Sequence, residues 1–336
     1  MQNRSAVNIV IIGAGDIARK RHIPAIQKAP NGVLYGFYDT NAERAHQWAD
    51  EFGTRAFETL DAVLQDPEVD AVLISTPPVV HVPLSVAAIE AGKHVLLEKP
   101  MATTVEEARQ IEAALAAHPD VKFMMLHIQR FYAPHQKAKE LLDRGEIGKL
   151  LTIRSFLCNS DKTLLQGIKK TPWHNSLHNV GIHRLDLMRW LVGDDVKEVF
   201  CHRSCLLDTV GADDHTIGIL QYENGVVGTM ICSRTSFNGE DRSTVLIGTG
   251  GTITTYARQH EVLVEKLNGE RQYYDFPSAH PQAYLELTDA HERFFQCILD
   301  NTPSPISARD GEESIRILSA LDRSDAERRW VSLSEF

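Results

Sequence analysis

A glycine-rich turn near the start of the chain has the residue types and spacing of a dinucleotide-binding site. Residues 13–18 read GAGDIA, which matches the pattern Gly-x-Gly-x-x-Gly/Ala, and they join an apolar run to a stretch of helical spacing. The first glycine permits a tight turn, the second leaves room for a pyrophosphate, and the N–H groups at the helix start bind the anion. Because turns also need glycine for structural reasons, the motif alone predicts only a nucleotide site. The predicted contacts are Gly13, Ala14, Gly15, Asp16 and Ile17.

A carboxylate at the end of the second apolar run narrows the predicted nucleotide to NAD. Asp39 follows the run 33–38, and no arginine adjoins it in the sequence Tyr38-Asp39-Thr40. A carboxylate there can accept both ribose hydroxyls of NAD and would repel the extra phosphate of NADP. The alternative is that Asp39 caps the helix that begins near Asn41. We expect NAD, with NADP disfavoured.

Alternating strands and helices must hold this turn in place. Five runs are short and apolar throughout, as in strands buried on both faces: 8–12, 33–38, 71–75, 94–97 and 122–126. Four stretches between them have the apolar spacing of helices: 17–28, 42–52, 80–91 and 105–117. This alternation predicts a doubly wound parallel sheet of the α/β Rossmann type over residues 1–127.

The remaining residues, 128–336, have a different pattern and predict an α+β domain. Strand follows strand from 196 to about 276, with turn sequences at 223–225 and 268–269, which is typical of an antiparallel sheet. One further strand is expected at 149–157. The expected helices lie at 134–144, near 180–191, near 282–299 and near 310–328.

Composition excludes several classes of protein. The 336 residues include 45 Asp and Glu against 35 Lys and Arg, a net charge of −10, which argues against wide contact with a nucleic-acid backbone. The five cysteines form no Cys-x-x-Cys pair, which favours a reduced, cytoplasmic compartment over a disulfide framework. No apolar stretch is long enough to cross a bilayer, and the first apolar run leads into the glycine turn instead of a cleavage site. We therefore expect neither a nucleic-acid nor a membrane partner.

Motifs along nearly the whole chain resemble the Gfo/Idh/MocA family of oxidoreductases. Besides the glycine turn, they are Ser75-Thr76-Pro77 with His81, the block 91–100 (AGKHVLLEKP), Arg130-Phe131, 145–148 (GEIG) and 181–186 (GIHRLD). Glu98-Lys99-Pro100 is the most specific of them. The resemblance implies a Rossmann domain followed by an α+β domain with a large, mostly antiparallel sheet. It also implies a homodimer or homotetramer that forms through that sheet.

The same resemblance implies a reaction and a set of residues. Most members move hydride between NAD(P) and a secondary alcohol or ketone of a sugar, cyclitol or related polyol. The substrate expected here is therefore a small polyhydroxy compound. The resemblance adds further residues to the cofactor site: Thr76, Pro77, His81, Glu98 and Lys99.

Lys99 and His183 are the expected catalytic residues. Lys99 follows the predicted strand 94–97 at its carboxyl end, the edge that faces the ligand in a doubly wound sheet. By resemblance, Lys99 contacts the reacting oxygen, where an ammonium group would stabilise a developing alkoxide. His183 matches the family histidine and titrates near neutral pH, which suits a proton acceptor. The alternatives are a solvated surface lysine and a hydrogen-bonded structural histidine.

The segment before His183 departs from the family pattern. Many members have an aspartate four residues before the histidine, whereas this chain has Asn179, which supplies no charge to an imidazolium. The motif therefore leaves the route of the proton undecided, and His174 and His178 are further candidates for carrying it. Histidines at this spacing can also bind a metal, but we expect none because the family generally works without one.

A second group of residues is predicted to bind substrate. Arg130 and Tyr132 follow the last Rossmann strand, Trp173 can stack on a sugar or pack in a core, and Asp186 can orient neighbours or make an ordinary helix hydrogen bond. The full set is Arg130, Tyr132, Trp173, His178, Asn179 and Asp186.

Two other functions fit the same motifs. A sensor would bind NAD and a ligand without turnover, as the loss of the family aspartate suggests. A lyase or hydrolase assisted by NAD would oxidise and regenerate the cofactor within one cycle.

Overall fold

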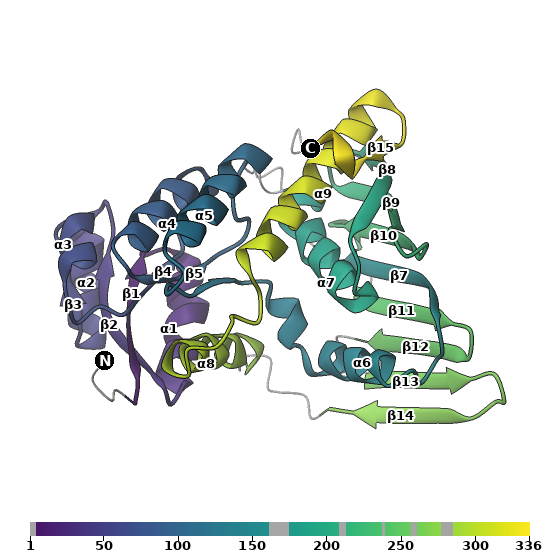
Figure 1. Ribbon diagram of the computed structural model, residues 1–336, viewed down its shortest axis with the longest axis horizontal. Helices are drawn as coiled ribbons and strands as arrows, with labels where there is room; N and C mark the ends of the chain where they lie inside the picture. Colours follow the sequence, from purple (N-terminus) through teal and green to yellow (C-terminus); the bar gives the residue numbers. More distant parts are fainter. Residues whose placement is uncertain (1–4, 161–174, 208–212, 237–238, 257–260, 277–284) are drawn as a thin grey trace. The chain divides into compact units, whose positions relative to one another are not determined.

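The computed structural model describes residues 5–160, 175–207, 213–236, 239–256, 261–276 and 285–336 (Figure 1). The chain divides into two units. The first unit contains Met1–Ile128 and Ala279–Ile315, and the second contains Gln129–Ser278 and Arg316–Phe336. The predicted domain boundary after residue 127 lies one residue from Ile128, where the chain first passes from the first unit to the second. The prediction differs for 279–315, which was assigned to the second domain and belongs to the first unit.

The first unit is built on a six-stranded sheet in which every neighbouring pair is parallel. Its strands are β1 (Val7–Ile12), β2 (Gly32–Tyr38), β3 (Arg55–Ala56), β4 (Ala71–Ile74), β5 (His94–Leu97) and β6 (Phe123–Met125). The order β3-β2-β1-β4-β5-β6 is that of the Rossmann fold. β1, β4 and β5 are almost completely buried, which explains their apolar sequences.

Helices connect these strands and cover the sheet. They are the short helix η1 (Ala18–His22), which continues into α1 (Ile23–Lys28), α2 (Ala42–Phe52), α3 (Leu60–Gln65), the short helix η2 (Pro78–Val80), α4 (His81–Glu90) and α5 (Val105–Ala117). The side chains of Asn41, Thr59 and Thr104 cap the N-termini of α2, α3 and α5. In Figure 1, α4 and α5 lie on one side of the sheet and α1 lies on the other. The short elements β3 and α3 were missed by the sequence analysis.

Helix α8 (Leu285–Leu299) completes the first unit from far along the chain. It packs beside α1 (Figure 1), and the ring of Phe295 fills the space that a side chain at Gly32 would need. Asn31 Nδ2 donates to Glu292 O at 3.0 Å. The segment before α9 (Ala308–Glu327) lies along the edge strand, where Met125 N donates to Ile306 O at 3.2 Å. These contacts explain why 279–315 belongs to the first unit.

The second unit is built on a nine-stranded sheet. Its strands are β7 (Leu150–Cys158), β8 (Val196–Ser204), β9 (His215–Tyr222), β10 (Val227–Ser233), β11 (Ser243–Gly248), β12 (Gly251–Tyr256), β13 (Glu261–Lys266), β14 (Arg271–Asp275) and β15 (Val331–Ser332). Their order is β14-β13-β12-β11-β7-β10-β9-β8-β15, and only the pair β7–β10 is parallel. The predicted antiparallel sheet is therefore confirmed, with the two predicted turns joining β9 to β10 and β13 to β14.

Helices cover one face of this sheet. α6 (Ala133–Asp143) packs on β12 and β13, and α7 (Ile182–Val192) packs on β7 (Figure 1). The second half of α9 lies along β8 and β9, where Cys201 N donates to Ser324 Oγ at 2.9 Å. The short helix η5 (Ser176–Gly181) leads into α7, and η6 (Leu333–Glu335) ends the chain. The predicted combination of an α/β Rossmann unit with an α+β unit is confirmed.

Candidate cofactor and active-site residues

The glycine turn follows β1 directly and requires glycine at its first position. Gly13 has a φ of +99°, and a Cβ atom there would lie 2.7 Å from the backbone oxygen of Ser75. Gly15 is different, because among the described residues other than its chain neighbours no atom lies within 4 Å of the position that its Cβ would occupy. The backbone at Gly15 is therefore open on the side where a pyrophosphate would approach.

Asp39 is fixed to the glycine turn by hydrogen bonds. Its Oδ2 accepts from Ala14 N at 2.7 Å, and its Oδ1 accepts from Asn41 N at 2.8 Å. The cap of α2 is Asn41, whose side chain accepts from Arg44 N at 3.1 Å. Asp39 therefore lies beside the turn, as a ribose-binding carboxylate must, and is not itself the helix cap.

Arg44 is a neighbour of this site that the sequence analysis missed. Its guanidinium lies 3.6 Å from Asp39 Oδ1, and its Nη1 donates to Ala14 O at 3.4 Å. The sequence feature that could have revealed Arg44 is its position in the first turn of the helix that follows Asp39. The two other predicted contacts on this side, Asp16 and Ile17, are exposed, and Asp16 pairs with Lys20 at 3.0 Å.

His81 joins the segments that follow β4 and β5. Its Nε2 lies 2.9 Å from Thr76 O, and its Nδ1 lies 2.7 Å from Pro100 O. Burial lowers the pKa of His81, so the neutral ring donates its single N–H to one of these carbonyls at a time. His81 thereby positions Thr76, while the adjacent Pro77 is exposed.

Three observations in this unit fit a bound dinucleotide. The open backbone at Gly15 and the fixed carboxylate of Asp39 are two of them. The third is Thr76 Oγ1, which is buried and has no hydrogen-bond partner among the described residues. These residues follow the carboxyl ends of β1, β2 and β4, the edge that binds ligands in open α/β sheets.

Glu98 and Lys99 follow the carboxyl end of β5. Glu98 Oε2 accepts from Lys99 N at 3.0 Å, and Glu98 Oε1 lies 3.0 Å from His22 Nε2. Although burial opposes it, the hydrogen bond and charge of His22 and the charge of Lys99 lower the pKa of Glu98 to about 2. Burial lowers the pKa of Lys99, an effect that Glu98 opposes and Arg21 reinforces.

Two buried histidines near Glu98 were missed by the sequence analysis. His22 Nδ1 lies 3.3 Å from His291 Nε2, and both rings are fully buried. Their positions in the sequence carry no common motif, since one lies in the first helix and the other in α8. Only the fold brings them together.

In the second unit, Arg130 and Asp186 form a buried bidentate ion pair. Arg130 Nε donates to Asp186 Oδ2 at 2.9 Å, and Arg130 Nη2 lies 2.5 Å from Asp186 Oδ1. The side chains are only 7% and 1% exposed, respectively. Both residues were predicted to bind substrate. The structure pairs them with each other, and their contact with a substrate stays a prediction.

The other predicted residues of the second unit lie on three different segments. Tyr132 stacks on His135 with ring centroids 5.5 Å apart, and His135 Nδ1 donates to Gln129 O at 2.7 Å. His178 bridges Asn175, at 2.9 Å from Nδ1, and Asp322 of α9, at 2.9 Å from Nε2.

Asn179 and His183 lie one helical turn apart where η5 continues into α7, and both are half-buried. Trp173 and His174 lie outside the described residues. Within the part of the chain that is described, no group of three or more His, Cys, Asp or Glu side chains could hold a metal ion. No described helix is long and apolar enough to cross a membrane.

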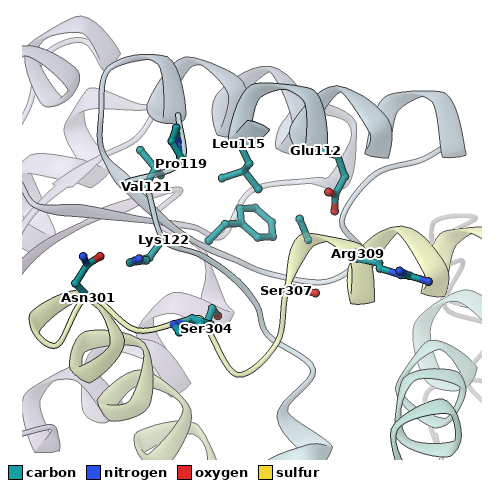
Figure 2. Close-up of a pocket in the computed structure, with 12 residues that line it drawn as sticks. Glu112, Leu115, Pro119, Val121, Lys122, Asn301, Ser304, Ser307 and Arg309 are labelled. Atoms are coloured by element: carbon teal, nitrogen blue, oxygen red, sulfur yellow. The ribbon is translucent and has the colours of Figure 1, made fainter. Parts of the chain in front are cut away.

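A pocket of about 460 Å³ in the first unit is separate from the predicted cofactor residues (Figure 2). Leu115, Pro119 and Lys122 line one side of it, and Asn301 and Ser304 line the other. It lies where β6 begins, whereas the glycine turn and Lys99 follow the carboxyl ends of their strands. The pocket therefore contains none of the predicted site residues.

Comparison with known proteins decides the family. Residues 7–127 match the model of an oxidoreductase family with an NAD-binding Rossmann fold, and residues 135–254 match the GFO/IDH/MocA C-terminal domain. The chain belongs to the Gfo/Idh/MocA family. This Gfo/Idh/MocA member is therefore an NAD-dependent oxidoreductase, as the sequence predicts.

Individual relatives match nearly the whole chain. The myo-inositol 2-dehydrogenase of Thermotoga maritima is 27% identical over 98% of this chain and 99% of its own length. The structure of scyllo-inositol dehydrogenase from Lactobacillus casei with NAD(H) and scyllo-inositol has a TM-score of 0.85 at 23% identity. It covers 98% of this chain and 99% of the other. Levoglucosan dehydrogenase in complex with NADH and levoglucosan has a TM-score of 0.86 at 23% identity, with the same coverage.

Proposed function

We propose that this enzyme transfers hydride between NAD(H) and a secondary alcohol or ketone of a cyclitol, sugar or related polyol. The substrate class is supported by full-length relatives whose names state inositol or levoglucosan as substrates. In this proposal Lys99 contacts the reacting oxygen and His183 accepts the proton.

The observation that carries the proposal is the setting of Lys99. It follows β5 at the carboxyl edge of the sheet, next to an ionised carboxylate, and burial lowers its pKa. A partly desolvated ammonium stabilises negative charge on a nearby oxygen far more strongly than a solvated one does. Lys99 would therefore favour the alkoxide form of the alcohol from which hydride leaves.

The other residues of the first unit hold the cofactor in this proposal. The backbone of Gly13–Gly15 binds the pyrophosphate, and Asp39 accepts hydrogen bonds from the ribose. Bound NAD supplies the acceptor, or NADH the donor, of the hydride. The protein then has to orient the reacting carbon and move the proton.

His183 is the proposed proton carrier in the second unit. Its position one helical turn after Asn179 lets the amide orient the ring, although the amide supplies no charge. A neutral orienting group leaves the imidazolium less stabilised than a carboxylate would. The proposed base is therefore weaker than one that is paired with aspartate.

A polyol screen with NAD tests the function. We expect reduced-cofactor absorbance to rise with one or more inositols or anhydrosugars, and Lys99→Met to lower kcat by about a thousandfold, within the range of electrostatic catalysis. The matched control is Lys28→Met, which replaces an exposed lysine of the same unit. Turnover by Lys99→Met that equals that of the control would exclude the proposed role. NAD binding without turnover across the screen would instead identify a sensor.

We further propose that the enzyme forms a homodimer or homotetramer through the open face of the nine-stranded sheet. Phe156, Ile231 and Ile217 lie side by side on β7, β10 and β9, and Ile217 is 47% exposed. Ile217→Asp should then lower the mass measured by light scattering to that of a monomer. Leu267→Asp, at an exposed leucine of the same unit, should not change it.

The cytoplasm is the proposed location of the enzyme. Cys158, Cys201, Cys232 and Cys297 form no disulfide in the structure, which is in keeping with a reducing compartment.

A further inference from the structure

The first turn of helix η5 is held by an aspartate from a distant segment of the second unit. Asp213 Oδ2 accepts hydrogen bonds from Ser176 N at 3.0 Å, from Leu177 N at 3.3 Å and from Ser176 Oγ. Ser176 N also donates to the backbone oxygen of Asp213 at 3.0 Å. The first N–H groups of a helix have no partner inside it, and a carboxylate at that end is favourable. Asp213 therefore acts as a cap from outside the helix.

Arg203 on β8 holds this aspartate in place. Its Nη1 lies 3.5 Å from Asp213 Oδ1 and 2.7 Å from Asp322 Oδ1. Asp322 Oδ2 in turn lies 2.9 Å from His178 Nε2. One guanidinium thus binds two carboxylates from different elements, and both carboxylates contact η5.

η5 contains a wide turn that leads to the proposed proton carrier. Ile182 N donates to Leu177 O, five residues earlier, which is the hydrogen bond of a π-helix. Such turns are rare and are found mostly within α-helices, often at functional sites. This one contains Asn179 and continues into α7, whose second residue is His183. Because the backbone is helical throughout, a shift of its first turn moves His183 as well.

We propose that Asp213 is a positioning residue that fixes the start of η5 and thereby the position of His183. This inference rests on the proposed role of His183 in proton transfer. Asn179 supplies no charge that would hold an imidazolium, so placement of the ring depends on the backbone that carries it. Arg203 contributes indirectly, because it holds Asp213 and Asp322 at the same time.

Asp213→Ala tests the proposal by separating turnover from cofactor binding. We expect kcat for the polyol to fall by about tenfold to a hundredfold, since a misplacement of about 1 Å can cost that much. The Kd of NAD should stay unchanged in calorimetry, because the predicted NAD contacts lie in the first unit. A loss of folded protein would instead lower the number of NAD sites. Unchanged kcat would overturn the proposal.

Asp213→Asn is the conservative variant. Its side-chain oxygen can still accept from Ser176 N and Leu177 N, although it loses the charge that faces Arg203. Its kcat should therefore lie between the values of Asp213→Ala and the unmodified enzyme. Equal kcat values in the asparagine and alanine variants would contradict the proposed cap.

Asp325→Ala is the matched control. Asp325 binds the same arginine, through Arg203 N at 2.9 Å and Arg203 Nε at 3.3 Å, and its other charged neighbours are His202 and Arg328. The control therefore weakens the ion-pair network without removing a contact to η5. It should lower Tm and leave kcat near that of the unmodified enzyme. A fall in kcat as large as that of Asp213→Ala would mean that general damage to the network is responsible.

Amide hydrogen exchange of the full-length protein, followed by NMR, tests the cap without any substrate. In the unmodified protein, the amide of Leu177 should exchange as slowly as amides within α7, although the first amides of a helix normally exchange fast. Fast exchange there would overturn the proposal whether or not a variant folds. Exchange at Leu177 should be about tenfold faster in Asp213→Ala and unchanged in Asp325→Ala. If no polyol is turned over, the proposed function fails, and the exchange rates still decide whether Asp213 holds η5.

Discussion

The carboxylate of Asp39 accepts a hydrogen bond of 2.7 Å from the backbone nitrogen of Ala14, the middle residue of the glycine turn. One side chain at the end of β2 is thus tied to the segment that follows β1. The same carboxylate has further lone pairs that a ribose can use. The position of Asp39 therefore links the shape of the turn to the choice of nucleotide.

Replacement of Asp39 should weaken NAD binding and relax the discrimination against NADP. Hydrogen bonds to a charged group contribute about 1.5–3 kcal/mol, so Asp39→Ala should raise the Kd of NAD by about tenfold to a hundredfold. The ratio of NADP to NAD affinity should rise because repulsion of the extra phosphate is lost. Titration calorimetry measures both constants. Asp50→Ala, at an exposed acid on α2, serves as the control, and equal Kd values in the two variants would refute the role of Asp39.

The two glycines of the turn should respond differently to alanine. Gly13→Ala places a Cβ 2.7 Å from Ser75 O at a φ of +99°, so it should destabilise the protein by about 1–3 kcal/mol. The added methyl group of Gly15→Ala meets no neighbouring segment among the described residues, so this variant should leave Tm unchanged. It should nevertheless weaken NAD binding, because the methyl group lies where the pyrophosphate would approach. Thermal melts with and without NAD separate the two effects. If Gly15→Ala binds NAD normally, the pyrophosphate lies elsewhere.

Asn179→Asp should strengthen the proposed base. A carboxylate one turn before His183 would stabilise the imidazolium, and about 1.4 kcal/mol of stabilisation raises the pKa of the ring by about one unit. We expect the acid limb of kcat to move upward and turnover above that limb to rise by about tenfold. Steady-state profiles of Asn179→Asp and Asn179→Ala supply the comparison. A loss of activity in both would mean that the amide itself is required.

Removal of only one partner of the pair formed by Arg130 and Asp186 should strongly destabilise the second unit. Asp186→Asn leaves a buried guanidinium without the carboxylate that pairs with it and should cost about 3–5 kcal/mol. The double variant Arg130→Met, Asp186→Leu removes both charges and should recover most of that loss. Urea denaturation of the three proteins tests this. Additive losses in the double variant would contradict a direct pair.

His135 should make the stability of the enzyme fall with acid. Burial and the nearby Arg184 lower its pKa to about 3, against about 6.5 in the unfolded chain. Between these values the unfolded state binds the extra proton, so stability falls as pH decreases from about 6.5 towards 3, by about 1.4 kcal/mol per pH unit. His135→Phe, which retains an aromatic ring beside Tyr132, should reduce the measured slope by the share of His135, while other buried histidines with a lowered pKa, such as His94 and His291, keep theirs. His202→Phe, at an exposed site, should leave the slope unchanged. Urea denaturation between pH 7 and pH 4.5 measures the slope.

The features that were predicted from the sequence are local in the chain. A strand with an unambiguous apolar pattern precedes the glycine turn, Asp39 and Glu98-Lys99-Pro100 in each case. Their position at the carboxyl edge of the parallel sheet could therefore be predicted. Arg130 and Asp186 were recognised as chemically active residues. Their pairing was not predicted, because it depends on how α7 packs in the second unit.

The features that were missed either depend on contacts between side chains that no motif records or are too short for a sequence pattern. His22 and His291 are 269 positions apart, and neither has a partner nearby in sequence that would mark it. Arg44 contacts Asp39 only because α2 folds back against the turn. β3 and α3 contain two and six residues, too few for a periodic pattern to be recognised.

The return of α8 to the first unit determines the order in which the cofactor unit can be completed during synthesis. When only the first 128 residues have emerged from the ribosome, all six strands of the first sheet are present. The edge strand β6 still lacks its contact with Ile306, and the surface around Gly32 still lacks Phe295. Those partners emerge only after the whole nine-stranded sheet except β15 has been made. The apolar surface around Gly32 therefore stays uncovered through most of translation, which is the period in which chaperones bind nascent chains.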